Sequence, residues 1–120
     1  MRDFRKLKVW QKAHELVLDA YRVTVGFPRE ELYGLTTQLR RASVSIPANI
    51  AEGCGREGEA ELRRFLRMGL GSANELEYHL LLLAKELRFL SLEYYKHVVG
   101  KLIEVKRMLT VLALKLKADS

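Results

Sequence analysis

The sequence predicts an all-α protein, an up-and-down four-helix bundle. Apolar residues recur at intervals of three and four through four long stretches, which is the spacing of amphipathic helices. Short turns containing glycine or proline separate these stretches, so that neighbouring helices run antiparallel. No stretch alternates apolar and polar residues for long, as a half-buried strand would. These three observations together define the fold class.

The first two helices are expected at about residues 7–25 and 30–53. The start of the second helix is open, because Gly34 could interrupt it before Thr36 or Thr37 caps the main helix. In the first helix, the predicted buried face is formed by Trp10, Ala13, Val17, Ala20 and Tyr21. Gly26 and Pro28 then end this helix, because glycine accepts the left-handed conformation after a helix and proline cannot continue one. In the second helix, the predicted buried stripe is formed by Leu35, Leu39, Ala42, Ile46 and Ile50.

A glycine-rich turn at 53–58 leads to the third and fourth helices, expected at about 59–88 and 92–117. The third carries apolar residues in alternating steps of four and three: Leu62, Leu66, Gly69, Ala73, Leu76, Leu80, Leu83 and Leu87. The fourth carries Tyr95, Val99, Leu102, Leu109, Leu112 and Leu116. This spacing favours the shallow crossing angles of a bundle. The chain, residues 1–120, is predicted to form a single domain.

The stretch RRASVSIPANIAEG, residues 40–53, places a proline in the middle of the second helix. Pro47 has no N–H to offer the carbonyl of Ser43, and its ring crowds that carbonyl. Two outcomes are open. The helix continues and kinks at this point, or Ser45 caps a new short helix that accepts the proline in its first turn.

Two polar residues follow the proline close to the apolar stripe. Asn49 falls on the stripe itself, and a buried amide must be hydrogen-bonded. Glu52, about one turn later, is a candidate partner for Arg40, Arg41 or Arg56. We therefore interpret the stretch as a structural device, a kink with a satisfied polar network, rather than as a ligand site.

The third and fourth helices carry more apolar residues than one core requires. The additional residues are Leu70, Leu81, Leu82, Val98, Ile103, Val111 and Leu114. A helix that is apolar on more than one face is either central or in contact with another subunit, and a four-helix bundle has no central helix. The sequence therefore predicts self-association. The small residues Gly69, Gly71, Ser72 and Ala73 fit either a second backbone or tight packing within one subunit.

The chain is basic, with a formal net charge of +6, and the excess lies near its two ends. Residues 1–12 carry a balance of +4 and residues 91–120 a balance of +3. Such charge is compatible with an anionic partner, because cations displace the counterions of a polyanion. Taken alone, it fits a solvated basic surface that only aids solubility at least as well. The candidate nucleic-acid-binding residues are Arg2, Arg5, Lys6, Lys8, Lys96, Lys101, Lys106 and Arg107, with Arg40, Arg41 and Arg56 as further candidates if they are exposed. Aromatic residues fall mostly at core spacing, so contacts to the nucleic-acid backbone are expected.

The sequence lacks the residue patterns that are typical of the enzyme classes considered for a helical bundle. Di-iron carboxylate bundles need Glu-x-x-His on two helices, but Gln11, Leu76 and Tyr94 stand three residues before the three histidines. The single cysteine, Cys54, excludes an internal disulfide and a cysteine-based zinc site. The GCGREG turn lacks the order of a phosphate-binding loop. The sequence therefore predicts no catalytic residue, no metal and no cofactor.

Membrane insertion is not expected either. The longest apolar run, Leu80 to Ala84, is far shorter than the roughly 20 residues that span a bilayer. The first residues are basic but contain no apolar segment of the kind found in a signal peptide. The sequence predicts a cytoplasmic protein without a membrane partner.

Three stretches carry a resemblance to a known family: LKVWQKAHEL, GFPREELYGLTTQLRRASVSIPANIAEGCGR and GSANELEYHL. They are similar to bacterial four-helix-bundle proteins encoded in intervening sequences of large-subunit ribosomal RNA genes. This family resembles the accessory variability determinant of diversity-generating retroelements, a basic bundle protein that binds nucleic acid and a reverse transcriptase. The resemblance extends from Leu7 to about Leu112. Its specific residues include Pro47, Asn49, Glu52, Gly53, Gly71, Ser72 and Glu75.

The resemblance implies a homopentamer, a ring of five bundles, and it implies no catalytic residues. The chain departs from the family pattern at Gly69, where alanine is expected, and at Gly58, where serine or threonine often starts the third helix. Both glycines should loosen that helix, Gly69 by up to about 1 kcal/mol relative to alanine.

Two functions stay open at this point. The leading hypothesis is a non-enzymatic homo-oligomer that binds the backbone of RNA or DNA with little sequence specificity. The alternative is a protein-interaction scaffold whose basic face meets an acidic protein partner and which has no role in nucleic-acid binding.

Overall fold

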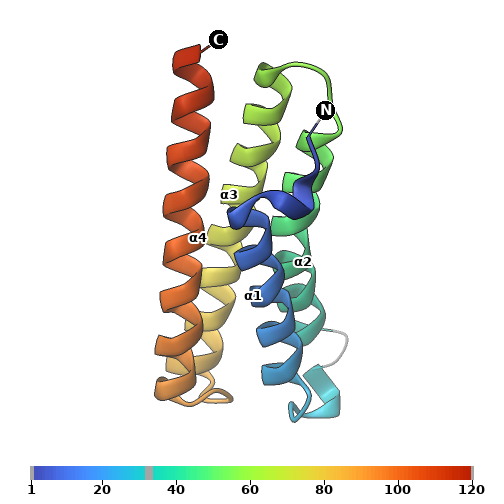
Figure 1. Ribbon diagram of the computed structural model, residues 1–120. Coiled ribbons are helices and arrows are strands. Elements are labelled where there is room, and N and C mark those ends of the chain that lie inside the picture. The colour runs from blue at the N-terminus through green and yellow to red at the C-terminus, as the bar shows by residue number, and fades with distance from the viewer. Residues whose placement is uncertain (1, 32–33, 120) are drawn as a thin grey trace.

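The structure, a computed structural model, describes residues 2–31 and 34–119. It contains four long helices: α1 (Lys8–Thr24), α2 (Leu35–Cys54), α3 (Glu59–Leu81) and α4 (Leu92–Asp119). They run up and down in turn, and each packs against two neighbours, α1 and α3 both lying between α2 and α4 (Figure 1). The described residues contain no strand. The predicted up-and-down four-helix bundle is confirmed.

Three short helical segments complete the fold: η1 (Phe4–Lys6), η2 (Arg29–Glu31) and the π-helical η3 (Leu82–Glu86). They explain where the helix bounds differ from the expected ones. Helix α2 begins at Leu35 rather than near residue 30, because residues 29–31 form a separate turn. Helix α3 is α-helical only as far as Leu81, because its last turn widens into η3.

The core is a column of aliphatic side chains contributed by all four helices. The largest completely buried side chains are Leu16, Leu39, Ile46, Ile50, Leu66, Leu76, Leu80, Leu83, Val98, Leu102, Val105 and Leu109. Burial of one such side chain contributes roughly 1.5–3 kcal/mol, so this column is the main source of stability. The predicted stripes of α2 and α3 are confirmed for most of their length. Leu87, predicted as the last core position of α3, is 41% exposed because it follows η3.

The buried face of α1 lies beside the predicted one. Its buried residues are Val9, Ala13, Leu16, Asp19, Ala20 and Thr24. Trp10 lies at the edge of this face, where its ring stacks on that of His14 at 5.0 Å, and Tyr21 is 43% exposed. The predicted face was therefore wrong at Tyr21, whereas Trp10 is partly buried and packs against the core.

Pro47 lies with its side chain buried inside an uninterrupted α2. The alternative in which Ser45 caps a new helix is therefore wrong, while the kink stays a prediction. The Asn49 side-chain amide donates hydrogen bonds to the Ser45 carbonyl at 2.8 Å and to its hydroxyl at 3.1 Å. The Ser45 hydroxyl also bonds that of Ser72 at 2.8 Å, which joins α2 to α3. Asn49 is thus hydrogen-bonded as predicted, and it is half-buried rather than buried.

Replacement of Asn49 by alanine is expected to lower the free energy of unfolding by about 1 kcal/mol, because a half-buried amide loses two hydrogen bonds. Urea denaturation followed by circular dichroism measures this change. Asn74→Ala is the matched control, since Asn74 is exposed on α3. Equal effects of the two substitutions would show that the Asn49 contacts contribute nothing.

Most of the small residues on α3 serve packing within one subunit. A Cβ at Gly69 would lie 3.6 Å from the Ile46 carbonyl oxygen and 3.9 Å from Leu109, where α2, α3 and α4 meet. Ala73 is also buried, whereas Gly71 is exposed with nothing within 4 Å of a Cβ. Tight internal packing is therefore the correct interpretation for this cluster, with the exception of Gly71.

The additional apolar residues fall into three groups. Val98 is 1% exposed and belongs to the core, so counting it as surplus was wrong. Leu70, Leu81 and Leu82 are half-buried. The exposed ones are Ile103, Val111 and Leu114, at 38%, 65% and 57% of their surface. The outer face of α4 is therefore one of the apolar surfaces that the bundle leaves open.

The thiol of Cys54 is buried at the end of α2, with 2% of the residue exposed. Burial raises the pKa of this thiol, and only a thiolate reacts with alkylating agents. We expect slow alkylation by iodoacetamide at mildly alkaline pH in the native protein and fast alkylation in urea. The folded state also holds the thiol proton more tightly than the unfolded state, so this group lowers stability as pH rises past the ordinary thiol pKa. Fast native alkylation would contradict the buried position.

Candidate nucleic-acid interface

Most of the net positive charge lies in one half of the bundle. The N-terminal segment, the turn between α2 and α3 and the last turns of α4 come together at the same end (Figure 1). We call segments 2–8, 52–67 and 107–116 the basic half. They carry ten Lys or Arg residues against five Asp or Glu residues, a balance of +5 out of the chain's +6. Charges that are separated in the sequence are thus neighbours in the fold.

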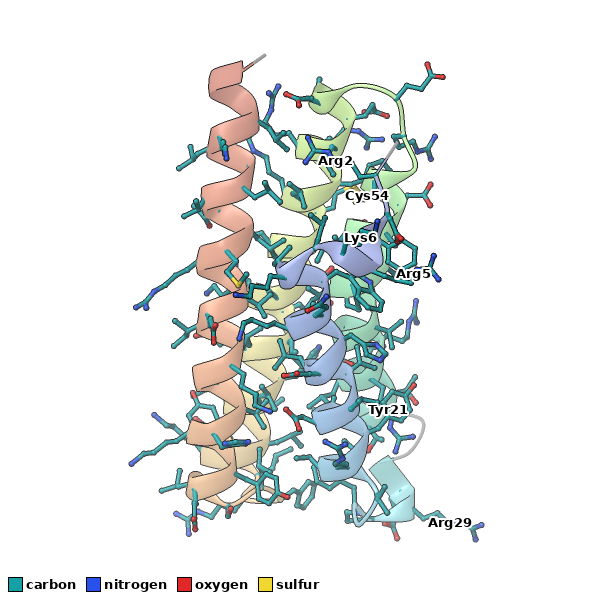
Figure 2. All side chains as sticks on the ribbon, viewed as in Figure 1. Arg2, Arg5, Lys6, Tyr21, Arg29 and Cys54 are labelled. Atoms are coloured by element: carbon teal, nitrogen blue, oxygen red, sulfur yellow. The ribbon has the colours of Figure 1, made fainter. Side chains whose placement is uncertain are left out.

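The N-terminal segment is held across this end by specific bonds. The Asp3 carboxylate accepts hydrogen bonds from the backbone N–H of Arg5 at 3.1 Å and from its guanidinium at 3.2 Å, which lower the pKa of Asp3. The backbone N–H of Arg2 donates to the Cys54 carbonyl at 3.1 Å. The Arg2 side chain pairs with Glu59 at 3.2 Å. Figure 2 shows Arg2 beside Cys54, so the segment brings its cations to the end of the bundle where α2 and α3 are joined.

The first turns of α3 add Arg63, Arg64 and Arg67, which the sequence analysis did not select. Arg64 pairs with Glu61 at 2.8 Å, which lowers the pKa of that carboxyl, and its guanidinium lies 4.6 Å from the centre of the Phe65 ring. A count of charges along the chain missed these arginines, because the glutamates in the same segment bring its net charge close to zero. The spacing of the three arginines, one and four residues apart on a helix, is the signal that could have found them.

The cations of the basic half differ in whether a carboxylate already holds them. Four are in ion pairs: Arg2 with Glu59, Arg5 with Asp3, Arg56 with Glu52 and Arg64 with Glu61. Five exposed cations have no ion pair within the described part of the chain: Lys6, Lys8, Arg67, Arg107 and Lys115. The free cations can bind a phosphate without first breaking an ion pair. They are therefore the first candidates for nucleic-acid contacts.

The ion pair between Glu52 and Arg56 confirms one of the three partners that the sequence analysis considered for Glu52.

Five predicted cations lie outside the basic half: Arg40, Arg41, Lys96, Lys101 and Lys106. Arg40 is half-buried between α1 and α2. Its guanidinium lies 4.5 Å from the centre of the Tyr21 ring, and its Nε donates to the Thr24 hydroxyl at 2.9 Å. Arg40 therefore joins two helices and has little freedom to contact a ligand.

The two lysines in the middle of α4 are also engaged. Lys101 pairs with Asp19 of α1 at 3.0 Å, and Lys106 pairs with Glu77 of α3 at 2.8 Å. Asp19 is 8% exposed, and Arg22 is its second partner at 3.3 Å. These pairs hold α4 against its neighbours, so we interpret both lysines as structural.

Metal-ligating side chains do not cluster in the described residues: no group of three or more His, Cys, Asp or Glu side chains is placed there to hold a metal ion. Nor is any helix in the described ranges long and apolar enough to cross a membrane. The Nδ1 and Nε2 atoms of His79 are buried without a hydrogen-bond partner.

The fold and the charge define a class: a small basic four-helix-bundle protein whose candidate site is an exposed cationic surface. A family model described as 23S rRNA-intervening sequence protein matches residues 5–111, so the chain belongs to this family. The resemblance read from the sequence is thereby confirmed.

One similar solved structure is a crystal structure of a protein of unknown function from the S23 ribosomal protein family of Bacteroides thetaiotaomicron. It is 26% identical to this chain with a TM-score of 0.78, and the match covers 88% of this chain and 97% of that one. A search of curated proteins found no match. Neither the matching family nor the solved neighbour is described as an enzyme.

Proposed function

We propose that this protein is a non-enzymatic cytoplasmic homo-oligomer that binds the backbone of RNA or DNA through its basic half. The observation that carries the proposal is the net charge of the basic half, which is +5 out of a formal net charge of +6 for the whole chain. Five of the cations there are exposed and free of ion pairs within the described residues. Contacts of this kind read phosphate density rather than base sequence, so low sequence specificity follows.

Self-association is the second part of the proposal. Exposed apolar residues on α2, α3 and α4 support it, among them Val44, Met68, Tyr78, Ile103 and Leu114. A pentamer, the assembly implied by the family resemblance, would carry +30 formal charges from five chains of +6. Such an array attracts a polyanion more strongly than one chain does.

The test is a titration of labelled structured RNA and labelled duplex DNA with the purified protein at roughly 50 and 200 mM salt. If five phosphates of a duplex are neutralised, the logarithm of the affinity falls with a slope of about −4.5 in the logarithm of salt concentration. This corresponds to a loss of about 500-fold over the fourfold range of salt.

Peptide nucleic acid of the same base sequence is the control, because it has no phosphates and should not bind. Duplexes of shuffled sequence should bind as well as the original. Absence of binding at the lower salt concentration, or binding that does not change with salt, would refute the proposal.

A further inference from the structure

A shallow apolar groove lies between the start of α1 and the last turns of α4. Its origin is a difference in length: α4 has 28 residues and α1 has 17, so α4 is longer by about 16 Å. The chain before α1 does not extend along α4 but crosses toward α2 and α3, where Arg2 bonds Cys54. The C-terminal part of α4 therefore has no first helix beside it.

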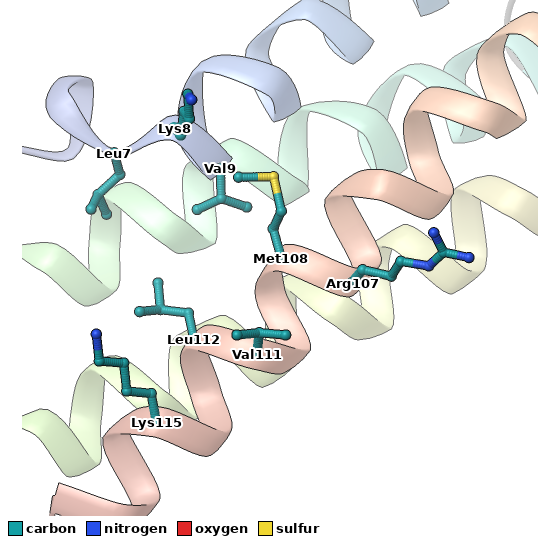
Figure 3. A pocket seen from close by; sticks show the side chains of 8 residues that line it. All are labelled: Leu7, Lys8, Val9, Arg107, Met108, Val111, Leu112 and Lys115. Atoms are coloured by element: carbon teal, nitrogen blue, oxygen red, sulfur yellow. The ribbon is translucent and has the colours of Figure 1, made fainter.

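The floor of the groove is apolar. It is formed by Leu7, Val9, Met108, Val111 and Leu112 and encloses about 430 Å³. Figure 3 shows Leu7 and Val9 opposite Met108 and Leu112, with Val111 beside them. Val111 keeps 65% of its surface exposed. Exposed apolar side chains that form one continuous hollow are typical of a binding surface.

The rim of the groove is cationic. Lys8, Arg107 and Lys115 line it, and no carboxylate among the described side chains does. Glu104, one turn before Met108, is already paired with Lys12 of α1 at 2.8 Å, which raises the pKa of that lysine. The groove thus offers an apolar floor between positive charges.

We propose that this groove binds an amphipathic, acidic helix of a partner protein. The distance along α4 from Arg107 to Lys115 is about 12 Å, or roughly two turns of a bound helix. Such a helix would place apolar residues at i, i+3 or i+4 and i+7 on the floor and carboxylates near both ends, against the cations.

Other occupants match the groove less well. A nucleic-acid backbone would neutralise the rim but leave the apolar floor in contact with water. A second copy docked by the same face would bring two sets of Lys8, Arg107 and Lys115 together, and like charges in contact disfavour such a pair. The partner helix satisfies both the floor and the rim, and the proposal does not depend on the proposed nucleic-acid function.

The test uses a fluorescein-labelled synthetic peptide of roughly four helical turns, with leucine at helical spacing and glutamate on both sides of that stripe. Fluorescence anisotropy measures its binding to the full-length protein. Two control peptides have the same composition in shuffled order, or lysine in place of glutamate. We expect binding of the first peptide and at least tenfold weaker binding of both controls.

Val111→Asn removes apolar contact from the floor at an exposed position and keeps every cation. It should weaken peptide binding at least tenfold, whereas Val25→Asn should not, because Val25 is an equally exposed valine at the far end of α1. Lys8→Gln combined with Lys115→Gln should weaken binding severalfold, less so at high salt. Nucleic-acid binding by Val111→Asn should equal that of the wild type, so failure of this proposal and failure of the proposed function are distinguishable.

Three results would overturn the proposal. The first is no binding of the acidic amphipathic peptide, and the second is binding that Val111→Asn leaves unchanged. The third is a change in the oligomeric mass of Val111→Asn, measured by light scattering, because a second copy would then occupy the groove.

Discussion

Replacement of Gly53 by alanine is expected to lower the free energy of unfolding by about 1–3 kcal/mol, the usual cost of overfilling a packed interior. Gly53 lies on α2 where α3 approaches it. A Cβ at this position would be 2.8 Å from the Cβ of Phe65 and 3.1 Å from Cδ1 of Leu62. The Cβ of Phe65 is attached directly to the backbone, so a rotamer change cannot relieve the contact. Helix α3 would have to move away from α2 instead.

Gly69→Ala is the matched control, because the same substitution in the same pair of helices should have the opposite sign. A Cβ there would meet its neighbours at 3.6–3.9 Å, which is ordinary contact. The substitution should therefore raise the free energy of unfolding by up to about 1 kcal/mol, because alanine has a higher helix propensity than glycine. Urea denaturation of the two variants and the wild type measures both effects. Equal stabilisation by both alanines would show that α2 and α3 are not in close contact at Gly53.

The core of α2 could be predicted because this helix carries one clear apolar stripe. Leu39, Ile46 and Ile50 have no equally apolar alternative on the opposite face of α2. The core of α3 could be predicted because its apolar residues recur in regular steps of four and three, despite additional apolar residues beside them. The stripe of α1 could not be fixed in this way, because Val9 and Trp10 are both apolar and adjacent, as are Ala20 and Tyr21. Only contacts with the other helices decide which member of each pair is buried.

The course of the chain at Pro47 also depends on tertiary contacts. Local preferences allow both a continuous helix and a new helix start. Burial of Pro47 and the bonds among Asn49, Ser45 and Ser72 favour the continuous helix. A residue in α3, far away in the sequence, thus contributes to the local structure of α2.

The candidate interface was predicted in part. The N-terminal cations were found from their density in the sequence, but Arg63, Arg64 and Arg67 were hidden by nearby carboxylates. In an up-and-down bundle the N-terminus, the turn after the second helix and the end of the fourth helix share one end. Adding together the charges of these three segments would have revealed the basic half. Arg40 could not have been assigned from the sequence, because its stacking partner Tyr21 was expected in the core.

The most direct test of the proposed function compares two triple charge reversals of the same size. One changes Lys6, Lys8 and Arg67 of the basic half to glutamate. The other changes Arg29, Arg41 and Lys96, which are exposed in the opposite half and have no ion pair within the described residues. Each variant lowers the formal net charge from +6 to 0, so the total charge is matched.

The measurement is the affinity for labelled duplex DNA as a function of salt concentration. If all three residues of the basic half contact phosphates, their reversal should reduce the steepness of the salt slope by about 2.7 and lower affinity by orders of magnitude at low salt. The opposite triple should change affinity only a few-fold. Equal losses from both variants, or a larger loss from the opposite triple, would contradict the assignment of nucleic-acid binding to the basic half.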